Sequence, residues 1–347
     1  MKDIKSLTLD ELTQAVNDLE MPAYRAEQIY KWLHEKGISS FDEMLNIPKN
    51  IRTLLGDIYY ISVASIEKKL ISCYDGTIKY LFKLYDGEFV ESVLMDYHHG
   101  YTICISTQVG CKMGCTFCAT GKSGFSRSLN ASEMLAQIQT AQQDNHIRIS
   151  NIVLMGMGEP LDNYDNVLRF LRLVSATQGL NIGMRHITLS TCGVVPRIYD
   201  LMNESLQVTL SISLHAPNDH IRSQTMPINN KYPVDTLLNA CRKYVDKTGR
   251  RITFEYAMID GINDSDDCAY ELSHKLKGMN CHVNLIPVND VNGVNYRKSN
   301  KQRLIEFSKI LDKNGITVTI RRTLGSDIDA SCGQLKRNYV PQADSEA

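Results

Sequence analysis

The chain has 347 residues, a formal net charge of −1 at pH 7 and 22% charged residues. This balance excludes a protein that binds nucleic acid or membrane through its overall charge, so any RNA contact has to come from a local patch. The first residues lack the apolar segment of a signal peptide, and no run of eighteen apolar residues follows, which predicts a cytoplasmic protein without a membrane span. Ten cysteines in a chain of this length indicate a reducing compartment, where thiols serve metal binding or catalysis.

Residues 1–95 are predicted to form a small helical accessory domain with lead-in strands. Apolar residues recur at helical spacing in 9–19 and 24–35, and a short helix is expected after Pro48. Thr8 and Glu11 have the spacing of a capping box. Strand-like runs at 77–85 and 89–95 lead into the next domain. The basic residues of this region form either an ordinary solvated face or a phosphate-contacting surface for RNA: Lys31, Lys36, Lys49, Arg52, Lys68 and Lys69.

Residues 96–324 alternate regularly between strand and helix patterns. Strands are predicted at 101–106, 150–155, 186–191, 207–213, 251–257 and 281–286, and helices at 131–143, 163–176, 196–203, 233–247, 266–277 and 299–314. Six strand–helix units predict a parallel sheet with helices outside. They are too few for a closed eightfold barrel, so we expect an α/β fold with a partial (β/α)6 TIM-like barrel. A last strand at 316–320 runs beside it, and 325–347 form a C-terminal segment.

Three cysteines, Cys111, Cys115 and Cys118, lie within eight residues just after the first barrel strand. Their C-x3-C-x2-C spacing suits three thiolates on one face of a 4Fe–4S cluster, which leaves the fourth iron without a protein ligand. A zinc site needs a fourth Cys or His, and no His lies between residues 100 and 121. Chance clustering of core cysteines is the other alternative, although the lysine and glycine between them are unlike a packed core. The pattern therefore favours a cluster.

Further distinctive residues follow the other strands, where the chemistry of such barrels is found. Gly158 and Glu159 lie in a turn after the second strand, where glycine permits close backbone approach and a carboxylate can accept hydrogen bonds from an ammonium group. The alternative is a plain strand–helix turn. Short polar groups at other strand ends are each common as caps, but together they suit a cofactor at the barrel mouth: Ser190, Ser213, His215 next to Leu214, and Asn289.

Two further cysteines have positions that favour chemistry. Cys332 follows the last strand in a polar segment beside a glycine, where a thiol can act as a nucleophile. Cys104 lies in the first barrel strand on the same face as Ser106, and both are predicted to point inward. The alternatives are a surface thiol and a core thiol, respectively.

These residues together resemble the RlmN/Cfr family of radical S-adenosylmethionine RNA methyltransferases. The resemblance runs from about residue 25 to residue 335. The motifs that carry it are STQVGCKMGCTFC (106–118), MGMGEP (155–160), SLHAPND (213–219), NLIP (284–287) and DIDASCGQL (327–335). Cys192 and Ser331 depart from the usual residues at their positions, without loss of a functional group.

The resemblance implies two cofactors, a 4Fe–4S cluster on the three cysteines and S-adenosylmethionine. It implies that Cys332 takes a methyl group from one S-adenosylmethionine, and that a 5′-deoxyadenosyl radical from a second one removes a hydrogen from that methyl. The carbon radical would then add to adenine and join enzyme and RNA covalently. Glu91 would take the ring proton, and Cys104 would attack the Cys332 sulfur to release the product.

The resemblance also implies the substrates and partners. They are adenine 2503 of 23S rRNA and adenine 37 of some tRNAs, methylated at C2, with an electron donor such as flavodoxin or ferredoxin, and we expect a monomer. MGEP at 157–160 and HAPN at 215–218 look like the C2 branch. The first alternative is C8 methylation of the same rRNA adenine, which gives antibiotic resistance. Two others are a radical enzyme for a small molecule and a zinc-stabilised RNA-binding module.

Overall fold

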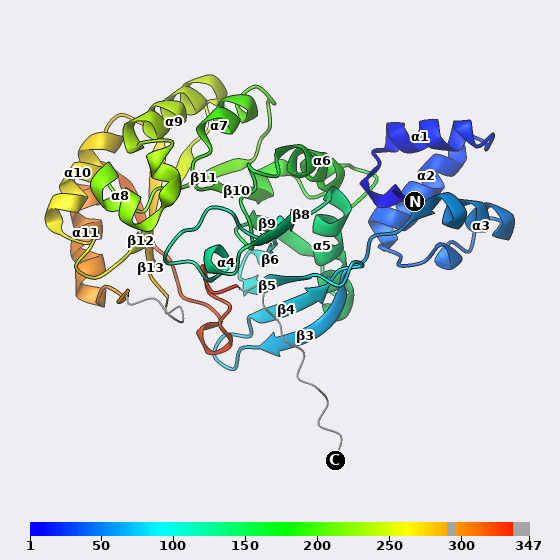
Figure 1. The fold of residues 1–347 in the computed structure, drawn as a ribbon, viewed down its shortest axis with the longest axis horizontal. Coiled ribbons are helices and arrows are strands. Elements are labelled where there is room, and N and C mark those ends of the chain that lie inside the picture. The colour runs from blue at the N-terminus through cyan, green and yellow to red at the C-terminus, as the bar shows by residue number, and fades with distance from the viewer. Residues whose placement is uncertain (290–295, 336–347) are drawn as a thin grey trace, which may run out of the picture.

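A ten-stranded sheet runs through the molecule, with helices along one part of it and an antiparallel extension at one edge (Figure 1). The computed structural model describes residues 1–289 and 296–335, so the distal part of the predicted segment 325–347 lies outside the described residues. The strand order is β14-β13-β12-β11-β10-β9-β6-β5-β4-β3. The strands are β3 (Ser65–Ile71), β4 (Ile78–Lys83), β5 (Phe89–Tyr97), β6 (Gly100–Cys104), β9 (Ile149–Leu154), β10 (Ile187–Thr191), β11 (Thr209–Ser213), β12 (Ile252–Met258), β13 (Cys281–Pro287) and β14 (Thr317–Ile320).

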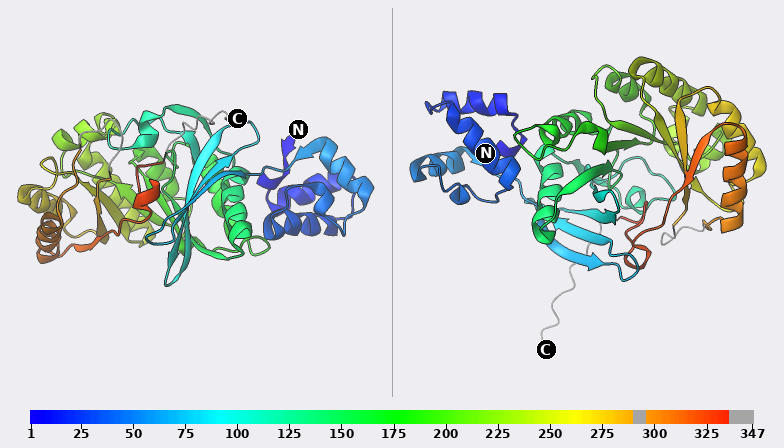
Figure 2. Two further views of the ribbon diagram at one scale, coloured as in Figure 1. Left: turned by 90° about the horizontal axis from the view of Figure 1, so that it is seen from below. Right: turned by 180° about the vertical axis from the view of Figure 1, so that it is seen from behind.

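The six consecutive parallel strands β6 and β9 to β13 form the predicted partial barrel, which is confirmed. Strand β14 pairs in parallel with β13, as expected. Helices connect the strands and cover the outside of the sheet (Figure 2). They are α5 (Ala131–Asn145), α6 (Tyr164–Ser175), α7 (Val195–Leu201), α9 (Val234–Thr248), α10 (Asp266–Leu276) and α11 (Lys301–Lys313). Each lies within a few residues of its predicted range because apolar periodicity marks a helix that packs on a sheet.

Strands β3, β4 and β5 are antiparallel and extend the barrel sheet beyond β6. The two strands predicted at 77–85 and 89–95 correspond to β4 and β5. Strand β3 was not predicted, because five of its seven residues are exposed and its pattern lacks a buried face. Residues 65–97 therefore share one hydrogen-bonded sheet with the barrel.

The N-terminal helices form a compact unit at one end of the molecule (Figure 1). They are α1 (Leu9–Asp18), α2 (Tyr24–Lys31), which continues as a π-helical turn over Trp32–Lys36, and α3 (Lys49–Ile58). The predicted capping box is present, since Glu11 N donates to Thr8 Oγ1 at 3.3 Å and Thr8 N donates to Glu11 Oε2 at 2.8 Å. This unit packs against α5, whose Gln139 and Gln143 donate to carbonyls of the π-helical turn and of the residue after it.

Short elements beside the cysteine loop were not predicted. Strands β7 (Gln108–Gly110) and β8 (Phe125–Ser128) pair around the loop, and the one-turn helix α4 (Ala119–Lys122) follows the last cysteine. A short helix α8 (Asp219–Thr225) lies beyond β11. Elements of three or four residues, such as β7, β8 and α4, carry too little periodicity to be recognised. Within the described residues, no helix is long and apolar enough to cross a membrane.

Candidate active site

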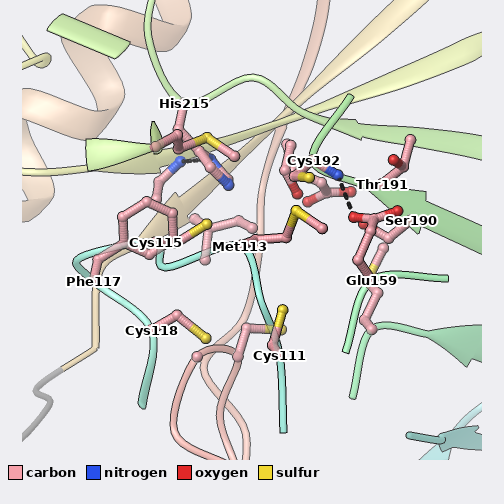
Figure 3. A pocket seen from close by; sticks show the side chains of 18 of the residues that line it. Cys111, Met113, Cys115, Phe117, Cys118, Glu159, Ser190, Thr191, Cys192 and His215 are labelled. Atoms are coloured by element: carbon pink, nitrogen blue, oxygen red, sulfur yellow. Dashed lines mark hydrogen bonds between the residues drawn. The ribbon is translucent and has the colours of Figure 1, made fainter. Parts of the chain in front are cut away.

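A cavity opens at the carboxyl ends of the barrel strands, and its empty volume, including the open mouth, is about 950 Å³. A space of this size holds a nucleoside-sized molecule. Its walls bring together most of the residues that the sequence singled out (Figure 3). The predicted site residues that line the cavity are Cys111, Cys115, Cys118, Gly158, Glu159, Ser190, Ser213, His215, Asn289 and Cys332.

Cys111, Cys115 and Cys118 lie on the loop between β7 and α4, with their sulfurs toward the cavity (Figure 3). The loop is anchored because Cys111 N donates to the carbonyl of Gly124 at 2.9 Å. Burial is the main cause that raises the pKa of the Cys111 thiol to about 12, and it raises that of Cys115 further. These thiols are therefore neutral by themselves, and a bound cation is what would convert them to thiolates.

The three cysteines fit a cluster better than a single ion. Among residues 1–289 and 296–335, no three His, Cys, Asp or Glu side chains are close enough together to hold one metal ion. In a 4Fe–4S cluster each thiolate binds a different iron, so the three sulfurs stand around a larger body. The loop presents its three sulfurs toward a cavity, which leaves room beside them for a body of that kind.

Glu159 lies at the cavity wall with 4% of its surface exposed. Its Oε2 accepts a hydrogen bond from Cys192 N at 2.8 Å, and its Oε1 accepts one from Leu161 N at 3.0 Å. Burial raises the pKa of this carboxyl above its usual value, and the backbone donors oppose that effect. The side chains of Thr191 and Cys192 also hydrogen-bond to this carboxyl, which lines the cavity where an ammonium group could reach it.

His215 is held in one orientation by the backbone. Ala257 N donates to its Nδ1 at 2.9 Å, so Nε2 carries the proton of the neutral ring and can donate to a ligand. Burial and the nearby Arg222 lower the pKa of His215 to about 3, so the ring is neutral at physiological pH. Phe117, the aromatic residue before the last cysteine of the loop, packs edge-on against it with ring centroids 5.0 Å apart.

The other predicted cofactor residues divide into two groups. Ser190 and Ser213 line the cavity, on the carboxyl ends of β10 and β11, and Asn289 lines it after β13. Asn289 also donates from Nδ2 to the carbonyl of Cys332 at 3.1 Å. Leu214 is fully buried in the core and does not line the cavity, so its side chain makes no part of the wall.

Cys332 lies where two cavities meet. It lines the main cavity and also a second one, whose walls include Cys104, Val93 and Arg321. Burial, together with repulsion from Cys332, raises the pKa of Cys104 to about 12. Attraction to Cys332 is the largest cause that raises the pKa of Arg321, although burial opposes it. The structure therefore brings the two predicted reactive cysteines into one electrostatic environment with a guanidinium.

Glu91 lies outside the lining of both cavities and is buried, with 8% of its surface exposed. Its carboxylate forms an ion pair with Lys79, with 3.0 Å between Oε1 and Nζ. It shares its strand with Val93, a wall residue of the second cavity. Glu91 is therefore near the Cys104 side of the site rather than the cluster side.

Several residues of the site were missed by sequence reasoning. Arg222 is fully buried and ties two strand ends together, since its Nη2 donates to the carbonyl of Cys192 at 2.7 Å and to that of Ser213 at 3.1 Å. Glu255 and Arg321 form a pair at 4.0 Å on the main cavity wall. A single buried charge carries no sequence pattern. Only the position of Glu255 within a predicted strand could have drawn attention to it, as a charged residue on a buried element.

Comparison with known proteins identifies the family of the chain. The family model of the radical SAM superfamily matches residues 105–272, and the model of the ribosomal RNA large subunit methyltransferase N-terminal domain matches residues 2–61. A relative from Alkaliphilus oremlandii, named a probable dual-specificity RNA methyltransferase RlmN, is 54% identical over 97% of this chain and 98% of its own. One of the same name from Clostridium tetani is 53% identical over 100% of this chain and 99% of its own.

A solved structure resembles the chain over nearly its full length. It is a radical SAM methyltransferase from Sphaerobacter thermophilus, 43% identical, with a TM-score of 0.92 over 97% of this chain and 100% of that chain. The superfamily model, the N-terminal domain model and the full-length relatives agree with one another. This chain belongs to the RlmN family of radical SAM methyltransferases.

Proposed function

We propose that the chain methylates C2 of adenine in RNA, at adenine 2503 of 23S rRNA and adenine 37 of tRNAs, by way of an S-methylated Cys332. The observation that carries the proposal is the position of Cys332 in the wall shared by the cluster-side cavity and the Cys104-side cavity. A thiol there can receive a methyl group on one side and deliver carbon to RNA on the other. The names of the relatives, RNA methyltransferases of dual specificity, support RNA as the substrate.

Cys111, Cys115 and Cys118 would hold the cluster. S-adenosylmethionine would bind in the same cavity, where Glu159, Ser190 and His215 would contact it. When bound, the cluster supplies the electron that splits S-adenosylmethionine and yields a hydrogen-abstracting radical. The remaining steps rest on side chains of this chain. Electrons would come from a donor such as flavodoxin or ferredoxin.

Adenine C2 is an electron-poor carbon, so a methyl group cannot be transferred to it by simple displacement. The Cys332 sulfur instead attacks the methyl of S-adenosylmethionine, forming a carbon–sulfur bond while the sulfonium bond breaks. After that methyl loses a hydrogen atom, its carbon radical would bond to C2, Glu91 would accept the C2 proton, and the adduct would return its unpaired electron to the oxidised cluster. Cys104, as a thiolate, then attacks the Cys332 sulfur. A disulfide forms as the bond between sulfur and the RNA-bound carbon breaks, and that carbon takes up a proton to become the methyl group.

The first test is anaerobic turnover on 23S rRNA and on tRNA with a reductant, followed by digestion to nucleosides and mass spectrometry. We expect 2-methyladenosine from both RNAs. Formation of 8-methyladenosine would replace the C2 assignment with the C8 alternative. A cluster-loaded enzyme that modifies neither RNA would refute the substrate assignment.

The second test is the Cys332→Ala variant. We expect it to bind the cluster as the wild type does, with the same broad absorption near about 400 nm from iron–thiolate charge transfer. It should form no methylated adenosine, because the methyl carrier is missing. Methylation of RNA at the wild-type rate by this variant would exclude the covalent route.

A further inference from the structure

Strands β4, β5 and β6 carry one continuous row of side chains on the sheet face that includes Val93 and Cys104, two wall residues of the second cavity. Lys79 pairs with Val93 across β4 and β5, and Val93 pairs with Cys104 across β5 and β6. Directly paired residues point to the same face of a sheet, so the Lys79 side chain lies on the same face as that of Cys104. The backbones of the two residues are two strand spacings apart, or about 10 Å. Glu91 is one step along β5 on that face and meets Lys79 diagonally.

The ammonium of Lys79 has two partners from different parts of the site. Its Nζ lies 3.0 Å from Glu91 Oε1 and donates to the carbonyl of Asp329 at 3.0 Å. Asp329 precedes Cys332 by three residues in the segment that covers the second cavity. Only 7% of the Lys79 surface is exposed. A lysine so far removed from water is tolerated because a carboxylate and a carbonyl replace its hydration.

The segment that carries Cys332 is fixed to the β3–β4 turn by further contacts. Asp327 accepts hydrogen bonds from Ser72 Oγ at 2.7 Å and from Cys73 N at 2.9 Å. Asp75 Oδ2 accepts one from Gly325 N at 2.9 Å. These contacts fix the start of the segment to the β3–β4 turn. Lys79 differs from them because it contacts both the segment and Glu91.

We propose that Lys79 is a positioning residue that fixes the Glu91 carboxylate relative to the Cys332 segment. The inference rests on the proposed function, in which Glu91 accepts the adenine C2 proton. Carbon on Cys332 can bond to adenine only with the segment in place, and Lys79 ties the Glu91 carboxylate to that segment. The 3.0 Å ion pair also fixes the direction in which the carboxylate points.

The test compares Lys79→Met and Lys79→Arg in the cluster-loaded enzyme during a single anaerobic turnover on a labelled RNA. In Lys79→Met we expect Cys332 methylation, measured by mass spectrometry of the protein, to stay within about twofold of wild type. Release of methylated RNA should slow by about 10- to 100-fold, less than the complete loss of a general base costs. The covalent RNA–protein species should accumulate on denaturing gels, and Lys79→Arg should restore most of the rate.

Lys83→Met is the matched control, because Lys83 is an exposed residue of the same strand. It should release RNA as the wild type does. The inference is wrong if Lys79→Met also releases RNA at that rate, or if its Cys332 methylation falls in step with release, which would show a merely structural role. The Glu91→Gln variant distinguishes failure of the proposed function from failure of the Lys79 inference. Full activity of Glu91→Gln would refute Glu91 as the base. An inactive Glu91→Gln together with a fully active Lys79→Met would refute the Lys79 inference alone.

Discussion

Cys104 shows how a place in a strand sets the chemistry of a single thiol. It lies at the end of β6 with 7% of its surface exposed, and burial is the main cause that raises its pKa to about 12. At pH 7 to 9 the thiol is therefore almost entirely protonated, and the attacking thiolate is a small fraction that grows tenfold per pH unit. In the proposed reaction Cys104 would therefore attack only from this small thiolate fraction.

We predict that release of methylated RNA from the covalent species rises about tenfold per pH unit between pH 7 and pH 9. The physical reason is the thiolate fraction of a group whose pKa lies above that range. Rapid acid quench during a single turnover measures the release rate at each pH. In Cys104→Ala the covalent species should persist at every pH, and a release rate independent of pH in the wild type would contradict the prediction.

The residues of the site differ in how far the sequence could reveal them. The cysteine spacing identified the loop at once, because few functions need three thiols so close together. The partners of Glu159 could not be foreseen, since Cys192 N reaches it from the end of another strand, 33 residues away. Arg222 was missed for the same reason, because its partners are backbone carbonyls that the fold brings together. Sequence patterns identify reactive groups, whereas only the fold shows what holds them.

At the scale of elements, the strands and long helices of the barrel were predictable and the short ones were not. Strand β10 alternates buried and half-buried residues, so its apolar side chains fill the core while Ser190 faces the cavity. The β7–β8 pair has no such signal, because its strands are only three and four residues long, with Gly110 at the end of the first and Gly124 just before the second. Yet this pair encloses the cysteine loop, and its geometry depends on those glycines.

We predict that Gly110→Ala weakens cluster binding. Gly110 has a φ of +79°, and a Cβ on it would lie 1.9 Å from the carbonyl oxygen of Gly124, the same carbonyl that anchors Cys111. The backbone of the loop would have to move, which displaces the first cluster ligand. Iron content per chain and the absorbance of the purified anaerobic protein should both fall to less than half of the wild-type values.

Gly124→Ala is the matched control for that variant. Gly124 also has a positive φ, of +74°, but a Cβ there meets no atom within 4 Å. Both variants carry the left-handed strain of alanine, about 1 to 2 kcal/mol, and only Gly110→Ala adds the collision. Equal iron content in the two variants would show that the collision is relieved without disturbing the cysteines.

At the scale of the whole molecule, the N-terminal helical unit is docked against α5 through a buried polar interface. His34 is fully buried at this interface and stacks on Tyr30 with ring centroids 4.1 Å apart. Neither of its ring nitrogens has a hydrogen-bond partner among the described residues. Lys5 is also buried there, and its Nζ donates to the carbonyl of Ser62 at 3.2 Å. The sequence predicted the helices of this unit, but periodicity cannot show that a histidine on them is buried.

This interface makes the stability of the protein depend on pH. Burial, and secondarily the charge of Lys5, lowers the pKa of His34 from an ordinary value of 6.5 to about 3. The unfolded chain therefore binds a proton more readily than the folded chain below pH 6.5. The contribution of His34 to stability is complete above that pH and is lost progressively as the pH falls toward 3. Between pH 7 and pH 5 the loss amounts to about 2 kcal/mol.

We predict that His34→Leu removes this part of the pH dependence. The free energy of unfolding, measured by urea titration of the anaerobic holoenzyme, should fall between pH 7 and pH 5 by about 2 kcal/mol less in the variant than in the wild type. The pKa of His215 is also lowered to about 3, so His215 contributes a similar loss of stability in both proteins. That contribution cancels when the variant is compared with the wild type. If the two proteins lose stability in parallel over this range, His34 is protonated in the folded state. The N-terminal unit would then have to move away from α5 to admit the charge.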